Sequence, residues 1–550
     1  MRLHLLLCIG TTCCLALCNS IKYVPSRVFP PLSLNAESEI AEALRAKLSD
    51  TVRNVLEDYS LQSQWDSTTS SFAIQLTSTD ETIWTSYHTA DVTDDIGGAP
   101  QKQVTGETAF RVASISKTFT VLALLLEKSI FLDDPVTEYI PELSHTVEDL
   151  IQWDQISLRA LASHLAGIPR DTGGNCFVWN EILDREDILP MLAELGFPPP
   201  NTSERRERHV CQIEDIIENA RQATPVFNPN DRSTYSNIAF SLLGAVLQRV
   251  TGEEYEDIIR AAVLDPLDMH HTTSLKPLDS QGIIPIEKND WKTDLGADAP
   301  TAGLYSTADD LSKYLRSILG AELLSQAEVH QWLKPVSWSN SGSQAAYGMP
   351  WEIQRMTINP GGRVVDIFAK GGSLKGYYSS IMLFPEFGLG LTILVAGAEA
   401  CLDELRERIT TVLLPAIDAA TCDHVRSQYV GKYVGKVKGW RIELDIDEGS
   451  GLKILEWTSN GTDFLQSYRF LQSIPESSQA RLVPTGVLLR EKQSWRITWD
   501  RSNDRMWSDF RFTNVDDIVY DNTALSEMLI SASGNTIEAL GITYTKTFEG

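Results

Sequence analysis

The stretch Phe110-Arg111-Val112-Ala113-Ser114-Ile115-Ser116-Lys117 decides how this 550-residue chain is interpreted. It leads into an apolar run over residues 118–126 that predicts a helix. Side chains three positions apart share one face of a helix, so Ser114 and Lys117 would lie together. A serine hydroxyl needs a base within hydrogen-bond reach to act as a nucleophile. If that face is apolar, burial makes the neutral amine of Lys117 accessible near neutral pH, and the lysine can serve as that base.

The same spacing also arises by chance, and the chain contains a second copy, Ser450-Gly451-Leu452-Lys453. That copy lies in a glycine-rich, strand-like region with no helix after it. The helical context therefore favours Ser114. The alternative is a serine and a lysine that only decorate a helix start, where serine is common as a cap.

A second motif, Tyr235-Ser236-Asn237, follows Phe227-Asn228-Pro229 and precedes a predicted helix over residues 239–250. A tyrosine and an asparagine two apart in a turn can point into one cleft. There the phenol can relay a proton, and the amide can hold a substrate amide or a lysine. The alternative is an ordinary, partly buried tyrosine with a satisfied hydroxyl. Tyr520-Asp521-Asn522 has the spacing without this context.

A third motif, Lys370-Gly371-Gly372-Ser373, lies between apolar segments at 365–369 and 377–384, in a predicted antiparallel strand pair. The two glycines let a ligand approach the backbone closely, and a neighbouring N–H can bind a developing oxyanion. Lys370 adds a fixed positive charge. Taken singly, a hairpin bend with a solvated lysine is the alternative.

Together and in this order, the three motifs resemble those of the serine β-lactamase and penicillin-binding-protein superfamily, in particular its class C β-lactamase-like branch. That branch includes esterases, D-peptidases and acyltransferases. The resemblance extends over residues 70 to 420. Supporting stretches agree in order and spacing: residues 158–168, 265–269, 302–311 and 347–351.

The resemblance implies a role for each matching residue. Ser114 would be the acylated nucleophile, Lys117 its base or proton shuttle, and Tyr235 the group that activates water or another hydroxyl for deacylation. Asn237 would position the substrate amide and Lys117. Lys370 would support Tyr235 electrostatically and attract a substrate carboxylate.

The resemblance also implies an oxyanion hole made by the N–H groups of Ser114 and Ser373. The third motif departs from the Lys-Thr-Gly pattern of true β-lactamases, because Gly371 stands where threonine would be. The missing hydroxyl argues against efficient β-lactam hydrolysis. Many esterase-like relatives carry histidine at the first position, so Lys370 keeps an anionic substrate possible.

For the fold, the resemblance implies an α/β architecture: a β-lactamase-like mixed antiparallel sheet flanked by helices, with a mostly helical subdomain across the cleft. The sequence pattern agrees, with strands predicted at 71–76, 82–87, 381–383 and 391–395 and a helix at 402–414. Apolar residues at helical spacing also predict an amphipathic first helix: Ile40, Leu44, Leu48, Val52 and Val55.

We expect three parts: a signal peptide over 1–20, a serine hydrolase domain over 21–422 and a separate all-β domain over 423–550. The last part contains short β-rich segments typical of a small barrel or sandwich, at 440–446, 454–457, 467–471, 487–490, 494–499 and 509–512. Its aromatic residues could line a ligand groove, although core packing is their commoner use. A charged insert over 172–232 lies beside the presumed cleft and is interpreted as a lid or a structural staple.

The N-terminus indicates secretion. Arg2 precedes an apolar run over residues 5–17 and small residues up to Ser20, which is typical of a signal peptide and too short for a comfortable membrane span. The runner-up is a signal anchor. Asn201 and Asn460 begin glycosylation sequons.

Four cysteines lie beyond the signal: Cys176, Cys211, Cys401 and Cys422. Four cysteines allow three connectivities. Proximity in the sequence favours Cys176–Cys211 and Cys401–Cys422. The alternative is four buried thiols, which is less common in a secreted chain.

The formal net charge of −27 argues against nucleic acid and anionic membranes as partners. No cysteine–histidine spacing indicates a metal and no glycine-rich phosphate loop indicates a nucleotide, so no cofactor is expected. The partner would be a small-molecule ester or amide.

The leading hypothesis is a secreted, esterase-like serine hydrolase that forms an acyl-Ser114 intermediate. Amide, D-peptide or β-lactam cleavage comes second, and an acyltransferase of natural-product biosynthesis stays open. The rival from another class is a non-catalytic binding protein that uses the same cleft. Its expected signature is the loss of Ser114, Lys117 or Tyr235, and all three are present.

Overall fold

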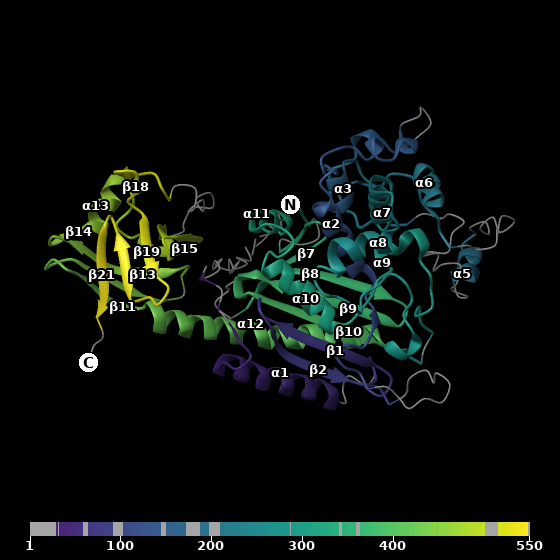
Figure 1. Ribbon diagram of the computed structural model, residues 1–550, viewed down its shortest axis with the longest axis horizontal. Coiled ribbons are helices and arrows are strands. Elements are labelled where there is room, and N and C mark those ends of the chain that lie inside the picture. Colours follow the sequence, from purple (N-terminus) through teal and green to yellow (C-terminus); the bar gives the residue numbers. More distant parts are fainter. Residues whose placement is uncertain are drawn as a thin grey trace, which may run out of the picture.

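The computed structural model describes most of the chain in two β-containing units that one long helix connects (Figure 1). The described residues are 29–30, 32, 34–58, 64–91, 103–144, 150–171, 188–196, 210–286, 288–339, 344–358, 364–447, 449–500 and 515–547. The connecting helix is α12 (Glu399–Tyr429), which extends from beneath the larger unit to the smaller one.

An eight-stranded antiparallel sheet forms the centre of the larger unit, in the order β2-β1-β10-β9-β8-β7-β6-β5. Its central strands are buried on both faces, so helices must cover each side. The predicted strand segments lie within β1, β2, β9 and β10. The strand bounds are β1 (Ser71–Thr77), β2 (Thr82–His88), β5 (Ser337–Trp338), β6 (Ala345–Tyr347), β7 (Glu352–Thr357), β8 (Val364–Leu374), β9 (Tyr377–Phe384) and β10 (Leu389–Ala396).

Two helices, α1 (Glu39–Glu57) and α12, pack together against one face of this sheet. The predicted amphipathic stripe of α1 supplies part of the core there, with Leu44, Leu48, Val52 and Val55 buried. On the other face α10 (Ala308–Leu319) packs on β1 and β10. The antiparallel sheet between two helical layers confirms the predicted fold class.

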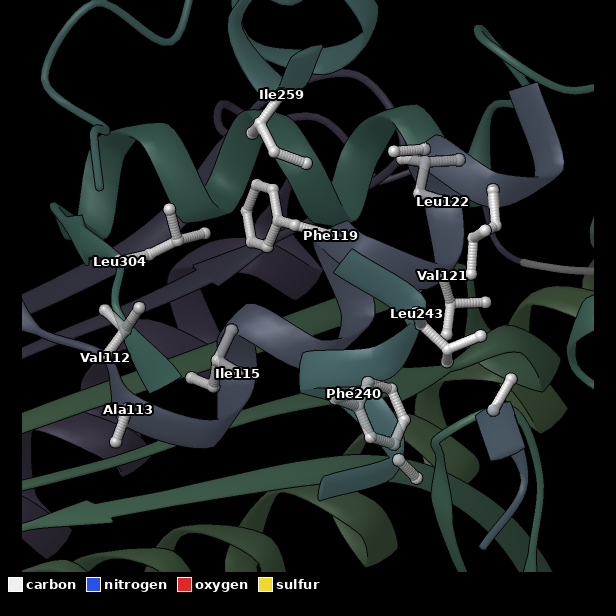
Figure 2. Close-up of a cluster of buried hydrophobic side chains, with 14 of the residues drawn as sticks. Val112, Ala113, Ile115, Phe119, Val121, Leu122, Phe240, Leu243, Ile259 and Leu304 are labelled. Atoms are coloured by element: carbon white, nitrogen blue, oxygen red, sulfur yellow. The ribbon is translucent and has the colours of Figure 1, made fainter. Parts of the chain in front are cut away.

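A mostly helical part lies beside the sheet and contributes half of the site described below. Its main helices are α2 (Ser116–Leu126), α3 (Leu158–Ala162), α6 (Ile213–Arg221), α7 (Ile238–Thr251), α8 (Tyr255–Ile259) and α9 (Ala299–Ala302). Figure 2 shows Phe119 of α2 facing Ile259 and Val121 close to Leu243, within one buried cluster. Because α2 is enclosed by apolar side chains, any charged group on it is costly to bury.

The C-terminal unit is a β-rich domain, as expected. Nine antiparallel strands are arranged in the order β12-β11-β21-β20-β19-β16-β15-β13-β14, and β12 also pairs with β13, so the sheet closes into a barrel. The long strands are β11 (Gly431–Gly435), β12 (Arg441–Asp445), β13 (Leu452–Ser459), β15 (Gln479–Leu489), β16 (Lys492–Asp500), β19 (Glu527–Ser531), β20 (Thr536–Ala539) and β21 (Ile542–Thr547). Short β14 (Thr462–Asp463) extends the sheet at β13.

Aromatic residues fill the core of this barrel, with Tyr433, Trp457, Trp495 and Tyr544 all buried. Core packing is therefore their main use. The end of α12 belongs to the same core through Val425 and Tyr429, which ties the barrel to the larger unit. The helix thus runs across residue 422, where the sequence placed a domain boundary.

One predicted strand of this domain is wrong. Residues 467–471 belong to helix α13 (Phe464–Leu471), whose N-cap Asp463 accepts a hydrogen bond from the Gln466 N–H. Leu465 and Tyr468 are buried on one side of that helix, at helical rather than strand spacing. Residues 509–512 lie outside the described part of the chain.

The predicted Cys401–Cys422 disulfide is also wrong. Both residues lie in α12, and neither takes part in a disulfide. At 1.5 Å per residue their Cα atoms are about 30 Å apart along the helix axis, whereas a disulfide needs about 7 Å or less. Nearness in the sequence is misleading inside one long helix.

The other predicted disulfide stays a prediction. Cys211 is disulfide-bonded. Cys176 lies outside the described residues, as do the signal segment 1–20, Asn201 and much of the insert. Asn460 is exposed in the turn between β13 and β14, which suits a glycan attachment site. None of the helices in the described ranges is both long and apolar enough to cross a bilayer.

Candidate active site

Ser114 lies in a tight turn, η2 (Ala113–Ile115), that leads directly into α2. Ala113 has φ +47°, a left-handed conformation that is strained for a residue with a side chain. Burial of Ala113 and Ile115 holds the turn, and the Ser116 hydroxyl donates to the Ala113 carbonyl at 2.7 Å. The turn therefore leaves Ser114 partly exposed while its neighbours remain in the core.

Lys117 lies one turn further, fully buried, with its ammonium against the nucleophile. Its Nζ donates to Ser114 Oγ at 3.1 Å, to Asn237 Oδ1 at 2.8 Å and to the carbonyl of Thr301 at 2.9 Å. Burial, together with the nearby charge of Lys370, lowers the pKa of Lys117 to about 8. A substantial fraction of neutral amine is thus accessible close to neutral pH.

The Tyr235 side chain interacts with the Ser114 hydroxyl, and this interaction contributes to the lowered pKa of the phenol. The serine therefore has a second group beside it that can accept a proton. Burial alone would raise the pKa of Tyr235, but the charges of Lys117 and Lys370 outweigh it and lower the pKa to about 8. The two ammonium nitrogens lie 5.1 and 5.2 Å from the centre of the tyrosine ring. The phenol is thereby prepared to exchange a proton near physiological pH.

Asn237, in the N-cap position of α7, connects the lysine to the surrounding scaffold. Its side-chain oxygen Oδ1 accepts a hydrogen bond from Lys117, and its Nδ2 donates to Asp171 Oδ1 at 2.8 Å. The predicted contact with Lys117 is present in the geometry. The predicted contact with a substrate amide stays a prediction.

Strand β8 brings the third motif against the nucleophile turn through Gly372. A Cβ on Gly372 would lie 2.3 Å from the Val112 carbonyl oxygen and 2.4 Å from Ser379 Oγ, so only glycine permits this approach. Ser373, the next residue of β8, is thereby brought to the turn that carries Ser114. The pairing of the Ser114 and Ser373 N–H groups as an oxyanion hole stays a prediction.

The surroundings of Lys370 differ most from those that the sequence predicted, because this lysine is buried and paired with a carboxylate. Its ammonium is buried and donates to Glu352 Oε1 at 2.7 Å and to the Gly371 carbonyl at 2.8 Å. Burial alone would lower its pKa, but Glu352 and Tyr235 outweigh that effect and raise it. Lys370 is therefore a constant cation beside Tyr235 with a carboxylate of its own.

Glu352 was missed in the sequence, although it directly follows the recognised stretch at 347–351. It lies on β7 opposite Ala369 of β8, so only the strand pairing brings it to Lys370. The signal available in the sequence was an acidic residue after Trp351, which carries no information about its partner.

Two further residues around Tyr235 were also missed. His164 stacks on the tyrosine ring at 4.3 Å, and its Nδ1 accepts the Ser236 N–H at 3.1 Å. Burial and the charge of Lys117 lower the pKa of His164 well below its usual value, so the imidazole is a neutral packing surface. Arg170 places its guanidinium carbon 4.8 Å from the centre of the same ring.

A buried carboxyl group lies behind Lys117. Asp298, 7% exposed, is hydrogen-bonded to the Ser241 hydroxyl. Ser241 in turn lies 3.0 Å from Thr301 Oγ1, and the carbonyl of Thr301 holds the lysine. Burial, with a contribution from Asp171, raises the pKa of Asp298 to about 6.

The raised pKa predicts a pH-dependent effect of Asp298→Asn on stability. The native state favours the protonated form of Asp298, so ionisation of this group lowers the free energy of unfolding of the wild type. This loss of stability is absent below the ordinary pKa of 3.8 and complete above about pH 6. Asparagine keeps an acceptor for Ser241 and cannot ionise. We expect the variant to gain about 2–3 kcal/mol relative to wild type between about pH 4 and about pH 7.5.

Urea unfolding at the two pH values measures this change. Asp257→Asn, an exposed aspartate of α8, serves as the control and should show little change. A relative stability of Asp298→Asn that falls as the pH rises would contradict the assignment.

The second copies of the first two motifs, at residues 450–453 and 520–522, lie in the C-terminal domain. Ser450 is buried in the C-terminal domain, and Lys453 lies 3.8 Å from Asp447 in an ion pair on the barrel. Tyr520 is exposed on a two-stranded ribbon of the same domain. The structure instead brings together Ser114, Lys117, Tyr235, Asn237 and Lys370 from η2, α2, the start of α7 and β8.

A serine on a strained turn at the start of a buried helix, with a buried lysine and a tyrosine against its hydroxyl, defines a protein of the active-site serine class built on the β-lactamase fold. Residues 62–412 match the family model described as Beta-lactamase. The chain belongs to the β-lactamase family. Residues 423–545 match a second model, described as Beta-lactamase-like-like, C-terminal domain.

Relatives that align along most of the chain occur in fungi. The chain is 30% identical over 515 residues to a Beta-lactamase-like protein of Arthroderma benhamiae, covering 86% of this chain and 83% of the relative. It is 27% identical over 565 residues to Probable hydrolase clz13 of Cochliobolus lunatus, covering 94% and 89%. A solved structure of a class C β-lactamase is similar in fold, with a TM-score of 0.50 and 17% identity over 69% of this chain and 98% of that one.

Proposed function

We propose that this protein is a serine hydrolase that forms an acyl-Ser114 intermediate and prefers esters. The observation that carries the proposal is the hydrogen bond from the buried Lys117 Nζ to Ser114 Oγ at 3.1 Å, with Tyr235 beside the same hydroxyl. Both partners have a pKa lowered to about 8, where each can accept or return a proton. The relative from Cochliobolus lunatus named as a probable hydrolase supports the same class.

In acylation, the amine of Lys117 or the phenolate of Tyr235 takes the Ser114 proton as Oγ attacks the ester carbonyl. The tetrahedral intermediate collapses, the C–O bond to the alcohol breaks, and the same proton passes to the departing alkoxide. In deacylation, Tyr235 takes a proton from water, which attacks the acyl carbon. The bond between the acyl carbon and Ser114 Oγ then breaks, the proton passes from Tyr235 to Oγ, and the products of the two steps are the alcohol and the free acid.

Esters come first because an alkoxide leaves more readily than an amide nitrogen and needs less assistance from a proton donor. Gly371 also removes the hydroxyl expected in the third motif of true β-lactamases. Amide, D-peptide or β-lactam cleavage is the second candidate for the acylation chemistry. Transfer of the acyl group to another alcohol uses the same steps, with that alcohol in place of water.

The test combines a covalent probe with turnover. A fluorophosphonate should add to one residue, in the peptide that contains Ser114, and p-nitrophenyl butanoate should be hydrolysed over many turnovers to free butanoic acid. Labelling at another residue, or no labelling, would contradict the proposal. Labelling with a single acylation and no release would point to transfer or binding instead.

Secretion is part of the same proposal, supported by the signal-like residues 1–20 and the disulfide-bonded Cys211, which suits an oxidising compartment. The intact mass of protein recovered from the medium of a secreting host measures it alongside the probe adduct. We expect a chain that begins shortly after residue 20. A full-length chain retained in the membrane fraction would indicate an anchor.

A further inference from the structure

The Lys370 ammonium is buried and hydrogen-bonded within the protein. It donates to Glu352 Oε1 at 2.7 Å and to the Gly371 carbonyl at 2.8 Å, and it lies 5.2 Å from the centre of the Tyr235 ring. The side chain is 1% exposed, so its charge is not accessible to an incoming substrate group.

Glu352 lies directly beside the third motif. Its Oε2 accepts the N–H of Gly371 at 3.3 Å and lies 3.6 Å from the position that a Cβ on Gly371 would take. A side chain at position 371 would therefore point at this carboxylate. At 35% exposed, Glu352 is accessible from solvent while its partner Lys370 is not.

The other cations near Ser114 belong to the mostly helical part and not to the strands that carry Glu352 and Lys370. Lys117 is fully buried and directed at Ser114, Asn237 and the Thr301 carbonyl. The exposed Arg170, whose carbonyl accepts the Asn237 N–H at 2.8 Å, lies at the start of α7, and its guanidinium is 3.5 Å from the Asp171 carboxylate. On the side of Tyr235 that β7 and β8 form, the accessible charge is thus the Glu352 carboxylate.

We infer that Glu352 is a built-in counter-ion that makes this site select substrates without a carboxylate on the leaving-group side. The inference rests on the proposed function and deepens it by naming the substrate class as neutral esters. The leaving-group side follows from the contact of Lys370 with Tyr235, which returns the proton to the departing alcohol. A substrate carboxylate there would face Glu352, and like charges placed together strongly disfavour binding.

A pair of esters with one acyl group and one phenol tests the inference: 3-carboxyphenyl butanoate and its methyl ester. Both are followed by phenol release, and each kcat/KM is divided by the rate constant of alkaline hydrolysis of the same ester. We expect wild type to favour the methyl ester by about tenfold or more, and Glu352→Gln, which keeps the shape and removes the charge, to reduce that preference at least about tenfold.

The matched control is Asp366→Asn. Asp366 pairs with Arg355 between the same two strands, at 2.7 and 3.1 Å and with similar exposure, away from the third motif. This variant should leave the preference unchanged. An equal shift in both variants would mean a general charge effect and would overturn the assignment to Glu352.

A labelling pair separates this inference from the proposed function. Benzylpenicillin carries a carboxylate and a fluorophosphonate does not, and both report acylation of Ser114 by intact mass without turnover. If neither ester is hydrolysed but the fluorophosphonate labels Ser114, the hydrolase proposal fails, and the inference still predicts that Glu352→Gln raises penicillin labelling relative to fluorophosphonate at least about tenfold. An unchanged ratio in a folded Glu352→Gln variant would overturn the inference. If the variant does not fold, a wild-type enzyme that favours the carboxylate ester would overturn it.

Discussion

Replacing Ser114 by alanine is expected to abolish ester hydrolysis and fluorophosphonate labelling while leaving the fold intact. The hydroxyl is the only group on the η2 turn that the proposed mechanism acylates, and alanine at this position leaves the buried neighbours Ala113 and Ile115 in place. Loss of a nucleophile removes the covalent route entirely, so kcat should fall by at least about 10⁴-fold. Circular dichroism and urea unfolding check that the variant is folded.

The chain offers its own control for this experiment. Ser450 begins the second Ser-x-x-Lys copy, and Ser450→Ala should keep both labelling and turnover. Labelling that persists in Ser114→Ala, or that disappears in Ser450→Ala, would overturn the assignment of the nucleophile.

Tyr235→Phe is expected to lower kcat/KM by about 10²–10⁴-fold, the range for a positioned acid–base group. The loss also has a pH signature. In wild type, kcat/KM should rise with pH up to about 8, because Lys117 and Tyr235 share the proton that must leave before Ser114 can attack. The phenol raises the pKa of Lys117, so its removal should move the remaining rise to lower pH.

A pH–rate profile of the wild type and the variant measures both effects. Tyr347→Phe is the matched control. Tyr347 is a second tyrosine near His164 and lies on β6, in the sheet that also contains β8. The control should keep the position of the rise. A Tyr235→Phe variant with wild-type kcat/KM, or with its rise at higher pH, would refute the shared proton transfer.

The two lysines of the site come from a helix and a strand. Helix α2 buries Lys117 deeply enough to lower its pKa, whereas β8 supplies a cation that Glu352 keeps charged. Tyr235 is close to both lysines, and their two positive charges lower its pKa. The two lysines beside the phenol thus come from different elements, and their pKa values are shifted in opposite directions.

Local patterns in the sequence determined much of this protein. Helical spacing located α1, and the apolar runs after the first two motifs located α2 and α7. The order of the three motifs, with their flanking elements, was enough to predict the fold class and to select Ser114 over Ser450. These features depend on residues within one or two turns of helix or strand, so the sequence carries them directly.

Only the tertiary structure decided the features that depend on distant residues. The Glu352–Lys370 pair requires the register of β7 against β8, and the Asp298–Ser241–Thr301 chain requires the packing of α7 against α9. The Cys401–Cys422 pairing failed because 21 residues of separation become about 30 Å along one continuous helix. The burial that lowers the pKa of Lys117 is likewise a property of the packed fold, since it depends on which side chains displace water from the ammonium. The approach of Lys117 and Lys370 to Tyr235 also depends on that packing.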